Sequence, residues 1–401
     1  MAHVLVLGGG FGGLAAAHEL RRRLPPGDDI TVVATSDRFF VGFAKLWDLV
    51  GFRPLLDGVR PLERLDERGI RFVRAEVTAI DPATRTVQTT AGTLTADGLV
   101  VALGATYQPA HAAQLHQDAY NLYHADALPG IRAALSELTS GRLLVCVLGT
   151  PYLCPPAPFE ATLLLDEWLR ARGRRAGVDV AVSTPAQLTL PVAGDDANRY
   201  LAGELKARDI TVLTDHAVES IDPDARQVRF RGGQTHEWEL LLAVPAAAPP
   251  PVVAESPLAG SDGWIEPDRH TFATDADRVY AAGDCTLIRT ATAQLPKAGV
   301  FAEAAGRIAA ANLATDLYGG DRPTFDGYGY CFLELPGQRV ATVTGDFYAE
   351  PEPAVRLALP DDASFRAKQQ WEQDRLTAWL GTDPIRPSSA DHEQESTYVA
   401  D

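Results

Sequence analysis

The chain has 401 residues, of which 46% are hydrophobic and 22% charged, and its formal net charge is −17. This composition is that of an ordinary globular protein, and the length predicts two compact lobes plus a small third element. No apolar run approaches the roughly 20 residues of a membrane helix, which excludes an integral membrane protein. The acidic charge argues against a nucleic-acid partner and leaves a basic protein partner and an oligomer open.

The number of cysteines and the first residues of the chain indicate in which cellular compartment the protein is expected. The four cysteines are too few for a secreted disulfide scaffold and form no CxxC pair, so we expect no metal site and no attached haem. The first predicted strand begins at His3, which leaves no room for an export leader. We therefore expect a cytoplasmic protein, with peripheral attachment to the inner face of the cell membrane as an open option.

The N-terminal elements predict a parallel sheet. A buried strand at His3–Leu7 leads into a glycine turn at Gly8–Gly13 and a helix at Leu14–Leu24, and Ile30–Val33 supplies the next strand. A βαβ unit of this kind implies parallel strands with right-handed crossovers. Further on, 70–101 alternates apolar and polar residues, which predicts a small antiparallel insertion that returns to the sheet.

The same order of elements then recurs, which predicts a second lobe of the same kind. Its strands and helices are expected at Leu143–Leu148, Glu160–Ala171, Val178–Val182, Asp196–Ala207, Ile210–Leu213 and Val218–Arg231. The break Pro245–Pro251 ends this lobe, and Val279–Leu313 resembles a return to the first. A β-like stretch around Tyr330–Val343, a helix-prone segment Phe365–Leu380 and a disordered polar tail from Thr382 follow.

The predicted fold is therefore α/β, with two Rossmann-like dinucleotide-binding lobes and a small C-terminal element. We expect a discontinuous first domain at 1–108 and 262–320. The second Rossmann-like domain is expected at 109–261, and a C-terminal interface and tail region at 321–401.

The glycine turn carries the first functional signal. Gly8 allows a tight turn, Gly10 removes the side chain where a pyrophosphate must approach, and Gly13 lets helix and strand pack closely. The helix N-terminus adds amides and a positive dipole. Because this G-x-G-x-x-G follows a strand and opens a helix, it predicts dinucleotide binding.

The ribose-binding carboxylate that usually ends the second strand is displaced. Here that strand is followed by Ser36 and Asp37, which can reach the ribose or simply form a turn. Both interpretations stay open.

Two further segments point to FAD. The apolar strand ending in Ala102–Ala105, together with Val279–Asp284, resembles the paired FAD motifs of the two-dinucleotide-binding-domain flavoproteins, in which an Asp at the position of Asp284 binds the ribityl chain. The expected cofactor-binding residues are Gly8, Gly10, Phe11, Gly12, Gly13, Ser36, Val77, Ala102, Gly104, Gly283, Asp284 and Lys297.

The second lobe lacks the corresponding glycine turn. After its first strand the chain reads Gly149-Thr-Pro-Tyr-Leu-Cys-Pro-Pro-Ala-Pro-Phe-Glu160. Proline has no amide to offer a phosphate, and the bulky Tyr152 and Leu153 stand where the backbone would have to come close. This argues against NAD(P)H as the electron donor.

What the second turn resembles is the Cys-Pro-Pro-Ala-Pro-Tyr-Glu segment of flavocytochrome c sulfide dehydrogenase flavoprotein subunits and the cysteine segment of sulfide:quinone oxidoreductases. The likeness extends to Gln294–Phe301 and to Gly329–Phe332. It implies that Cys154 and Cys331 form a redox disulfide beside the isoalloxazine ring; taken without it, both are more readily ordinary core cysteines than redox-active ones.

The chemistry of such a disulfide is clear. Hydrosulfide attack gives a persulfide on one cysteine and a thiolate on the other, and the thiolate can pass two electrons to the flavin. Glu160 is the expected proton acceptor if burial raises its pKa, and Lys297 is expected to stabilise the charge of the reduced flavin. Cys146 and Cys285 are expected to be core residues. Gly42 lies where the flavocytochrome subunits carry a flavin-linked cysteine, so FAD is expected to bind non-covalently here.

The electron acceptor is expected to be a quinone or a cytochrome. Aromatic and apolar residues near the C-terminus form either a membrane-interfacial patch or a surface that docks on the protein's own first lobe. They are Phe365, Trp371, Leu376, Trp379 and Leu380, with Lys368 and Arg375 nearby. The leading interpretation is an FAD-dependent enzyme that oxidises sulfide or a related sulfur compound. The alternatives are a type II NADH:quinone dehydrogenase-like flavoprotein and a non-catalytic FAD-binding protein.

Overall fold

The first lobe is built on a five-stranded parallel sheet. A computed structural model describes residues 1–116, 119–291 and 293–384. The sheet has the strand order β20-β9-β1-β2-β5, and every neighbouring pair is parallel. Its strands are β1 (His3–Leu7), β2 (Asp29–Ala34), β5 (Arg71–Arg74), β9 (Gly98–Val101) and β20 (Val279–Ala281). Because β20 joins strands from the first 101 residues, the sheet membership supports the discontinuous domain we propose.

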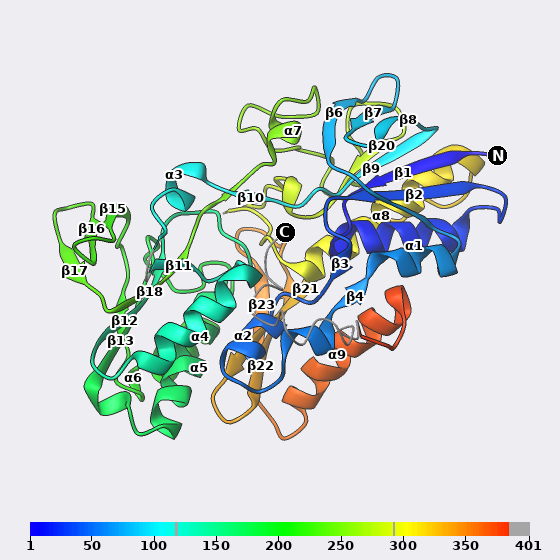
Figure 1. The fold of residues 1–401 in the computed structure, drawn as a ribbon. Coiled ribbons are helices and arrows are strands. Elements are labelled where there is room, and N and C mark those ends of the chain that lie inside the picture. Colours follow the sequence, from blue (N-terminus) through cyan, green and yellow to red (C-terminus); the bar gives the residue numbers. More distant parts are fainter. Residues whose placement is uncertain (117–118, 292, 385–401) are drawn as a thin grey trace, which may run out of the picture.

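The two faces of this sheet are covered differently. Helices α1 (Phe11–Arg23) and α8 (Gly299–Tyr318) lie side by side on one face, and the small antiparallel sheet of β6 (Val77–Asp81), β7 (Thr86–Thr89) and β8 (Gly92–Thr95) covers the other (Figure 1). The antiparallel insertion is thus smaller than expected. Residues Arg71–Arg74 belong instead to β5, a parallel edge strand in which Arg71 and Arg74 are exposed and Phe72 and Val73 are half-buried.

The second lobe repeats this plan. Its parallel sheet has the order β11-β18-β12-β13-β14, with helices packed on one face and a three-stranded antiparallel sheet on the other. The sheet strands are β11 (Ala119–Asn121), β12 (Gly141–Val147), β13 (Val178–Ser183), β14 (Thr211–Leu213) and β18 (Leu240–Val244). The covering elements are α4 (Leu128–Glu137), α5 (Ala157–Ala171), α6 (Gly194–Lys206), β15 (Val218–Asp222), β16 (Gln227–Phe230) and β17 (Thr235–Glu237).

The C-terminal element lies between and beneath the lobes (Figure 1). It is an antiparallel sheet of β21 (Tyr328–Leu335), β22 (Arg339–Asp346) and β23 (Ala354–Ala358), followed by α9 (Ser364–Leu380). The short remaining elements are β3 (Arg38–Phe39), α2 (Ala44–Leu49), β4 (Arg60–Pro61), β10 (Thr106–Tyr107), α3 (Pro109–Ala112), β19 (Ala247–Ala248), α7 (Pro251–Ala254) and the 3-10 helices Leu55–Gly58, Leu62–Arg68, Ala125–Ala127, Arg175–Gly177 and Gly283–Cys285.

Helix α9 docks on the first lobe. Phe365, Leu376, Trp379 and Leu380 are all buried, and Trp379 packs edge-on against Phe11, with ring centroids 5.8 Å apart. The C-terminal end of the helix is held by arginines, since Arg60 and Arg64 donate to the carbonyls of Gly381 and Leu380. Four of the five apolar side chains expected on this helix are thus covered by the protein itself, and Trp371 is half-buried, which favours docking on the first lobe over a membrane-interfacial patch.

Two further observations concern the described part of the chain. None of its helices combines the length and the hydropathy needed to cross a bilayer. None of its His, Cys, Asp and Glu side chains gather in a group of three that could hold a metal ion. The tail expected to be disordered falls outside the described residues from position 385 onward.

Candidate active site

A cavity of about 340 Å³ lies where the first lobe, the second lobe and the C-terminal element meet. Most of the residues expected from the sequence line it. They are Gly10, Phe11, Gly12, Ala102, Gly104, Cys154, Glu160, Gly283, Asp284, Lys297 and Cys331. Four expected cofactor residues do not line it, namely Gly8, Gly13, Ser36 and Val77.

The glycine turn has the geometry that a dinucleotide site needs. Gly8 has a φ of +117°, and a side chain there would put Cβ 2.1 Å from the carbonyl oxygen of Ala102. A Cβ on Gly13 would lie 1.9 Å from the carbonyl oxygen of Gly8, so helix and strand touch at this point. A Cβ on Gly10 would meet nothing within 4 Å. The first two glycines therefore shape the turn, while Gly10 leaves open space for a pyrophosphate at the N-terminus of α1.

Asp284 presents a carboxylate to the same cavity. Burial raises its pKa, an effect that Lys297 partly opposes. No donor in the described part of the chain hydrogen-bonds to its side-chain oxygens, so they can accept from sugar hydroxyls. Together with the open space at Gly10, this unpartnered carboxylate fits the ribityl chain of FAD.

Lys297 has a structural task as well as a place in the cavity wall. Its Nζ donates to the carbonyls of Asp284 (2.8 Å) and Thr286 (2.9 Å) and lies 3.6 Å from the centroid of the Trp264 ring. Burial lowers its pKa to about 8. The lysine thus fixes the 3-10 helix that carries Asp284, and its effect on a reduced flavin remains a prediction.

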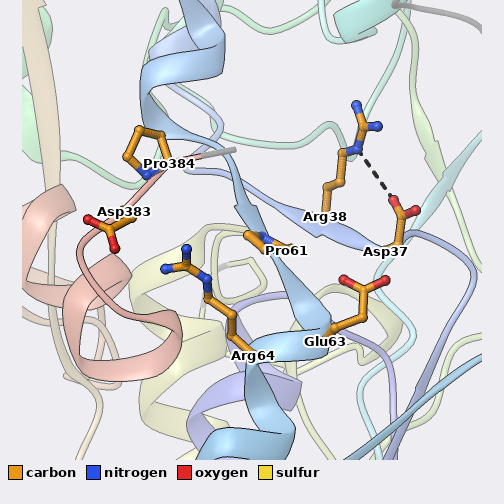
Figure 2. Close-up of a pocket in the computed structure, with 7 residues that line it drawn as sticks. All are labelled: Asp37, Arg38, Pro61, Glu63, Arg64, Asp383 and Pro384. Atoms are coloured by element: carbon orange, nitrogen blue, oxygen red, sulfur yellow. Dashed lines mark ion pairs between the residues drawn. The ribbon is translucent and has the colours of Figure 1, made fainter. Parts of the chain in front are cut away.

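The side chains of Ser36 and Asp37, which were expected to contact the adenosine ribose, already have partners within the protein. Ser36 Oγ donates to the Arg38 carbonyl (2.9 Å) and accepts the Arg38 N–H (3.1 Å), which is the turn alternative. Asp37 pairs with Arg74 at 2.9 Å and with Arg38 at 3.5 Å. Figure 2 shows this second pair at the rim of an open pocket, across from Asp383. The ribose contact remains a prediction.

Val77 is buried at the start of β6 and packs in the core beneath the sheet. It is not among the residues that line the cavity. Its place among the cofactor residues also remains a prediction.

The two cysteines come from distant parts of the chain and meet at one cavity. Cys154 lies in the turn before α5 with a φ of +46°, an uncommon left-handed conformation for a residue with a side chain. Its N–H donates to the Lys297 carbonyl (2.8 Å), which ties the second lobe to the first. Cys331 is half-buried on β21, and both residues carry free thiols in this structure.

The electrostatic surroundings of these thiols differ. The Cys154 side chain opens into the cavity, yet the enclosing walls remove it from bulk water, and this burial raises its pKa to about 12; Glu160 raises it too, while Lys368 and Lys45 lower it. Burial, Cys154 and Glu160 raise the pKa of Cys331, also to about 12. Cys154 is thus close enough to Cys331 to raise its pKa, as expected for neighbours at one site.

Glu160 belongs to a buried charge cluster. Its Oε1 accepts the Glu334 N–H (2.7 Å) and lies 3.3 Å from Lys368 Nζ, which also pairs with Glu334 at 2.7 Å. Glu334 in turn accepts from Trp47 Nε1 through both oxygens. Burial raises the pKa of Glu160 although Lys368 opposes this, so the carboxyl can hold a proton next to the cysteines.

Sequence reasoning missed several residues of this site. Lys45 on α2 and Tyr123 in the second lobe line the cavity near Cys154. Where the C-terminal element borders the cavity, the Trp371 ring packs against Phe43 and Phe332, with centroid distances of 5.9 Å and 5.7 Å respectively. One signal was available for the lysines, because the chain has only four of them among 36 basic residues and three line this cavity.

Three other expectations concern residues around the site. Cys146 and Cys285 are fully buried, which confirms them as core residues. Gly42 lines the cavity, and a glycine there has no side chain to which a flavin can be linked.

Comparisons with known proteins agree with this geometry. The chain is 27% identical to the mitochondrial sulfide:quinone oxidoreductase of Mus musculus over 367 residues, which cover 87% of this chain and 79% of that protein. It is 30% identical to the sulfide-quinone reductase of Aquifex aeolicus over 264 residues, or 63% of this chain and 60% of that protein.

The fold has a solved counterpart. The crystal structure of the sulfide:quinone oxidoreductase from Aquifex aeolicus superposes with a TM-score of 0.84 at 24% identity, covering 100% of this chain and 96% of that one. The model of the pyridine nucleotide-disulphide oxidoreductase family matches residues 2–311, well over half of the sequence. The chain therefore belongs to the pyridine nucleotide-disulphide oxidoreductase family.

Proposed function

We propose that this protein is an FAD-dependent sulfide:quinone oxidoreductase that oxidises hydrosulfide through a Cys154–Cys331 disulfide. The observation that carries the proposal is the meeting of these two cysteines, 177 positions apart in the sequence, at the cavity that Gly10 and Asp284 also line. The similarity to sulfide-oxidising relatives supports the same substrate.

The cofactor is proposed to be FAD, bound without a covalent link. Its pyrophosphate would lie at Gly10–Gly12, its ribityl chain at Asp284, and its ring in the cavity that both cysteines line. When bound, the isoalloxazine ring supplies a two-electron acceptor. The replacement of the second glycine turn by Cys154-Pro-Pro disfavours a nicotinamide donor, and with it the NADH dehydrogenase alternative.

The residues of the chain account for the sulfur chemistry. Hydrosulfide attacks one sulfur of the oxidised pair, a new S–S bond forms as the old one breaks, and the other cysteine leaves as a thiolate with the electron pair. The attacked cysteine then carries the substrate sulfur as a persulfide. When this persulfide and the thiolate join in a Cys–S–S–S–Cys bridge, one proton and two electrons are released, and a bound FAD would accept the two electrons. Glu160 is the proposed proton acceptor, because it is buried beside both cysteines and its pKa is raised.

The electron acceptor is proposed to be a quinone. Phe43, Phe332 and Trp371 give the cavity an aromatic end suited to a flat, apolar ring. A cytochrome acceptor, and contact with the inner face of a membrane, stay predictions.

Anaerobic stopped-flow reduction tests the proposal. Sulfide should bleach the flavin of the parent protein, and Cys154→Ser and Cys331→Ser should each slow the bleaching by more than a hundredfold. NADH should not bleach it. Equal bleaching by the parent and both variants would refute the disulfide mechanism, and fast bleaching by NADH would restore the NADH dehydrogenase alternative.

A further inference from the structure

Lys45 differs from the other two lysines of the cavity in how its charge is engaged. Lys368 lies between two carboxylates, and Lys297 donates to two backbone carbonyls beneath an aromatic ring. Lys45 donates to the Tyr123 carbonyl, and its Nζ is 5.7 Å from the centroid of the Tyr123 ring. Within 1–116, 119–291 and 293–384, no carboxylate pairs with it. Its positive charge is thus not neutralised by a neighbouring acid.

The position of Lys45 links that charge to Cys154. Tyr123 accepts from Lys45 through its carbonyl oxygen and donates from its hydroxyl to the Cys154 carbonyl at 3.3 Å. Lys45, Tyr123 and Cys154 therefore form one stretch of the cavity wall. In this enclosed setting, the ammonium favours a negative charge on the Cys154 sulfur.

The second cysteine has no such neighbour. The groups that act on Cys331 are Cys154 and Glu160, which both disfavour its thiolate, whereas two lysines favour the thiolate of Cys154. Lys368 favours the Cys154 thiolate more strongly than Lys45 does, but Lys368 is held between Glu160 and Glu334. Lys45 is therefore the one of these two lysines that no carboxylate in the described part of the chain pairs with.

We propose that Lys45 is a positioning residue that stabilises the Cys154 thiolate and so makes Cys154 the leaving sulfur. This inference rests on the proposed sulfide oxidation. Hydrosulfide forms its bond to Cys331 Sγ, the Cys154–Cys331 bond breaks, and Cys154 keeps the electron pair as a thiolate. Cys331 is left as a persulfide that carries the hydrogen of the hydrosulfide. A better-stabilised thiolate leaves faster, which is why the cation belongs beside Cys154.

Other titratable groups around Cys154 come from several elements. They are Tyr107, Tyr123, Tyr152, Glu160, Cys331 and Lys368. Burial raises the pKa of all three tyrosines well above neutrality, and Lys368 stays charged between its two carboxylates. On α2 itself, Asp48 is paired with Arg132. Burial lowers the pKa of Lys45 and of Lys297, which also lines the cavity, to about 8, so both are expected to lose their charge between pH 7 and 9.5. Lys297 is the same in every variant below, so a difference between the parent and the Lys45 variants reports on Lys45.

Alkylation of Cys154 tests this without any sulfide or quinone. The FAD-loaded protein carries Cys331→Ser, so that Cys154 is the accessible thiol, since Cys146 and Cys285 are buried. Iodoacetamide labelling rates are measured from pH 6.5 to 9.5, with Cys154 followed by mass spectrometry. The variants are Lys45→Met and Lys45→Arg, and the matched control is Lys206→Met at the exposed end of α6.

The expected signature is a rate difference that depends on pH. A thiol pKa one unit higher means tenfold less thiolate and about threefold more nucleophilicity, so below pH 7.5 Lys45→Met should react about threefold more slowly than the parent. The two should converge toward pH 9.5, where the parent lysine is almost fully neutral. Lys45→Arg should keep the faster rate throughout, and Lys206→Met should match the parent.

Two results would overturn the inference. One is a Lys45→Met profile equal to that of the parent, and the other is a constant slowing at every pH that arginine does not rescue. If Lys45→Met does not fold, Lys45→Arg decides, because it must outpace the parent above pH 8.5. If sulfide does not bleach the flavin while the alkylation difference appears, the substrate proposal fails and the role of Lys45 in stabilising the thiolate stands. If sulfide bleaches the flavin and the alkylation difference is absent, the substrate proposal stands and the proposed role of Lys45 fails.

Discussion

Removing the Lys368 side chain should destabilise the protein strongly and in a pH-dependent way. Lys368 is 1% exposed and pairs with Glu160 at 3.3 Å and Glu334 at 2.7 Å, so Lys368→Met leaves two buried carboxylates without their cation. Breaking a buried ion pair in this manner costs about 3–5 kcal/mol. At about 2–4 °C per kcal/mol for a lobe-sized domain, the apparent Tm should fall by roughly 6–20 °C.

The pH dependence follows from the direction of the Glu160 pKa. Burial raises that pKa in the folded protein above its usual value of 4.5, and the loss of Lys368 raises it further. The folded state then holds a proton that the unfolded state releases, so stability is fully present below pH 4.5 and is lost as the pH rises through the folded-state pKa. The deficit of Lys368→Met relative to the parent should therefore be larger at pH 8 than at pH 5.5.

Thermal unfolding at these two pH values, followed by circular dichroism, measures both effects. Lys206→Met serves as the matched control and should unfold with the parent. The double variant Glu160→Gln/Lys368→Met should recover part of the loss, because the amide no longer has to be buried as an anion. An equal Tm deficit at both pH values, or a double variant less stable than the sum of the single effects, would refute the reasoning.

The remaining predictions concern the flavin site. Gly10→Ala should fold normally and lose flavin, because its Cβ enters open space where the pyrophosphate is expected, whereas Gly13→Ala should lower the apparent Tm, because its Cβ would lie 1.9 Å from a carbonyl oxygen. Flavin content and melting curves separate the two, and equal behaviour would contradict the assigned roles. Asp284→Asn should weaken FAD binding by about 1.5–3 kcal/mol, the usual contribution of a hydrogen bond to a charged group. Fluorescence titration of the apoprotein checks this, and an unchanged affinity would remove Asp284 from the ribityl contact.

Much of the architecture could be predicted because local sequence patterns specify it. The strand, turn and helix of residues 3–23 follow from an apolar run, a glycine spacing and a helical periodicity that involve neighbouring residues only. The prolines after Thr150 similarly rule against a phosphate-binding turn without reference to the rest of the chain.

Other features depended on which surfaces meet. The mixed polar and apolar residues of Arg71–Arg74 suit a parallel edge strand as well as an antiparallel hairpin, and the apolar face of α9 has the same pattern whether a membrane or the first lobe covers it. Periodicity reports that a face is covered and does not report what covers it.

The sequence by itself determined the dinucleotide turn, the missing second turn and, through a family resemblance, the two cysteines. Only the tertiary structure decided that Lys368, Glu334 and Glu160 share one buried cluster and that Lys45 lies beside Cys154. The physical reason is distance along the chain. A backbone turn is set by consecutive residues, whereas the charge balance at Cys154 also depends on Lys45 and Lys368, which lie more than a hundred positions away and approach the sulfur only when the lobes pack.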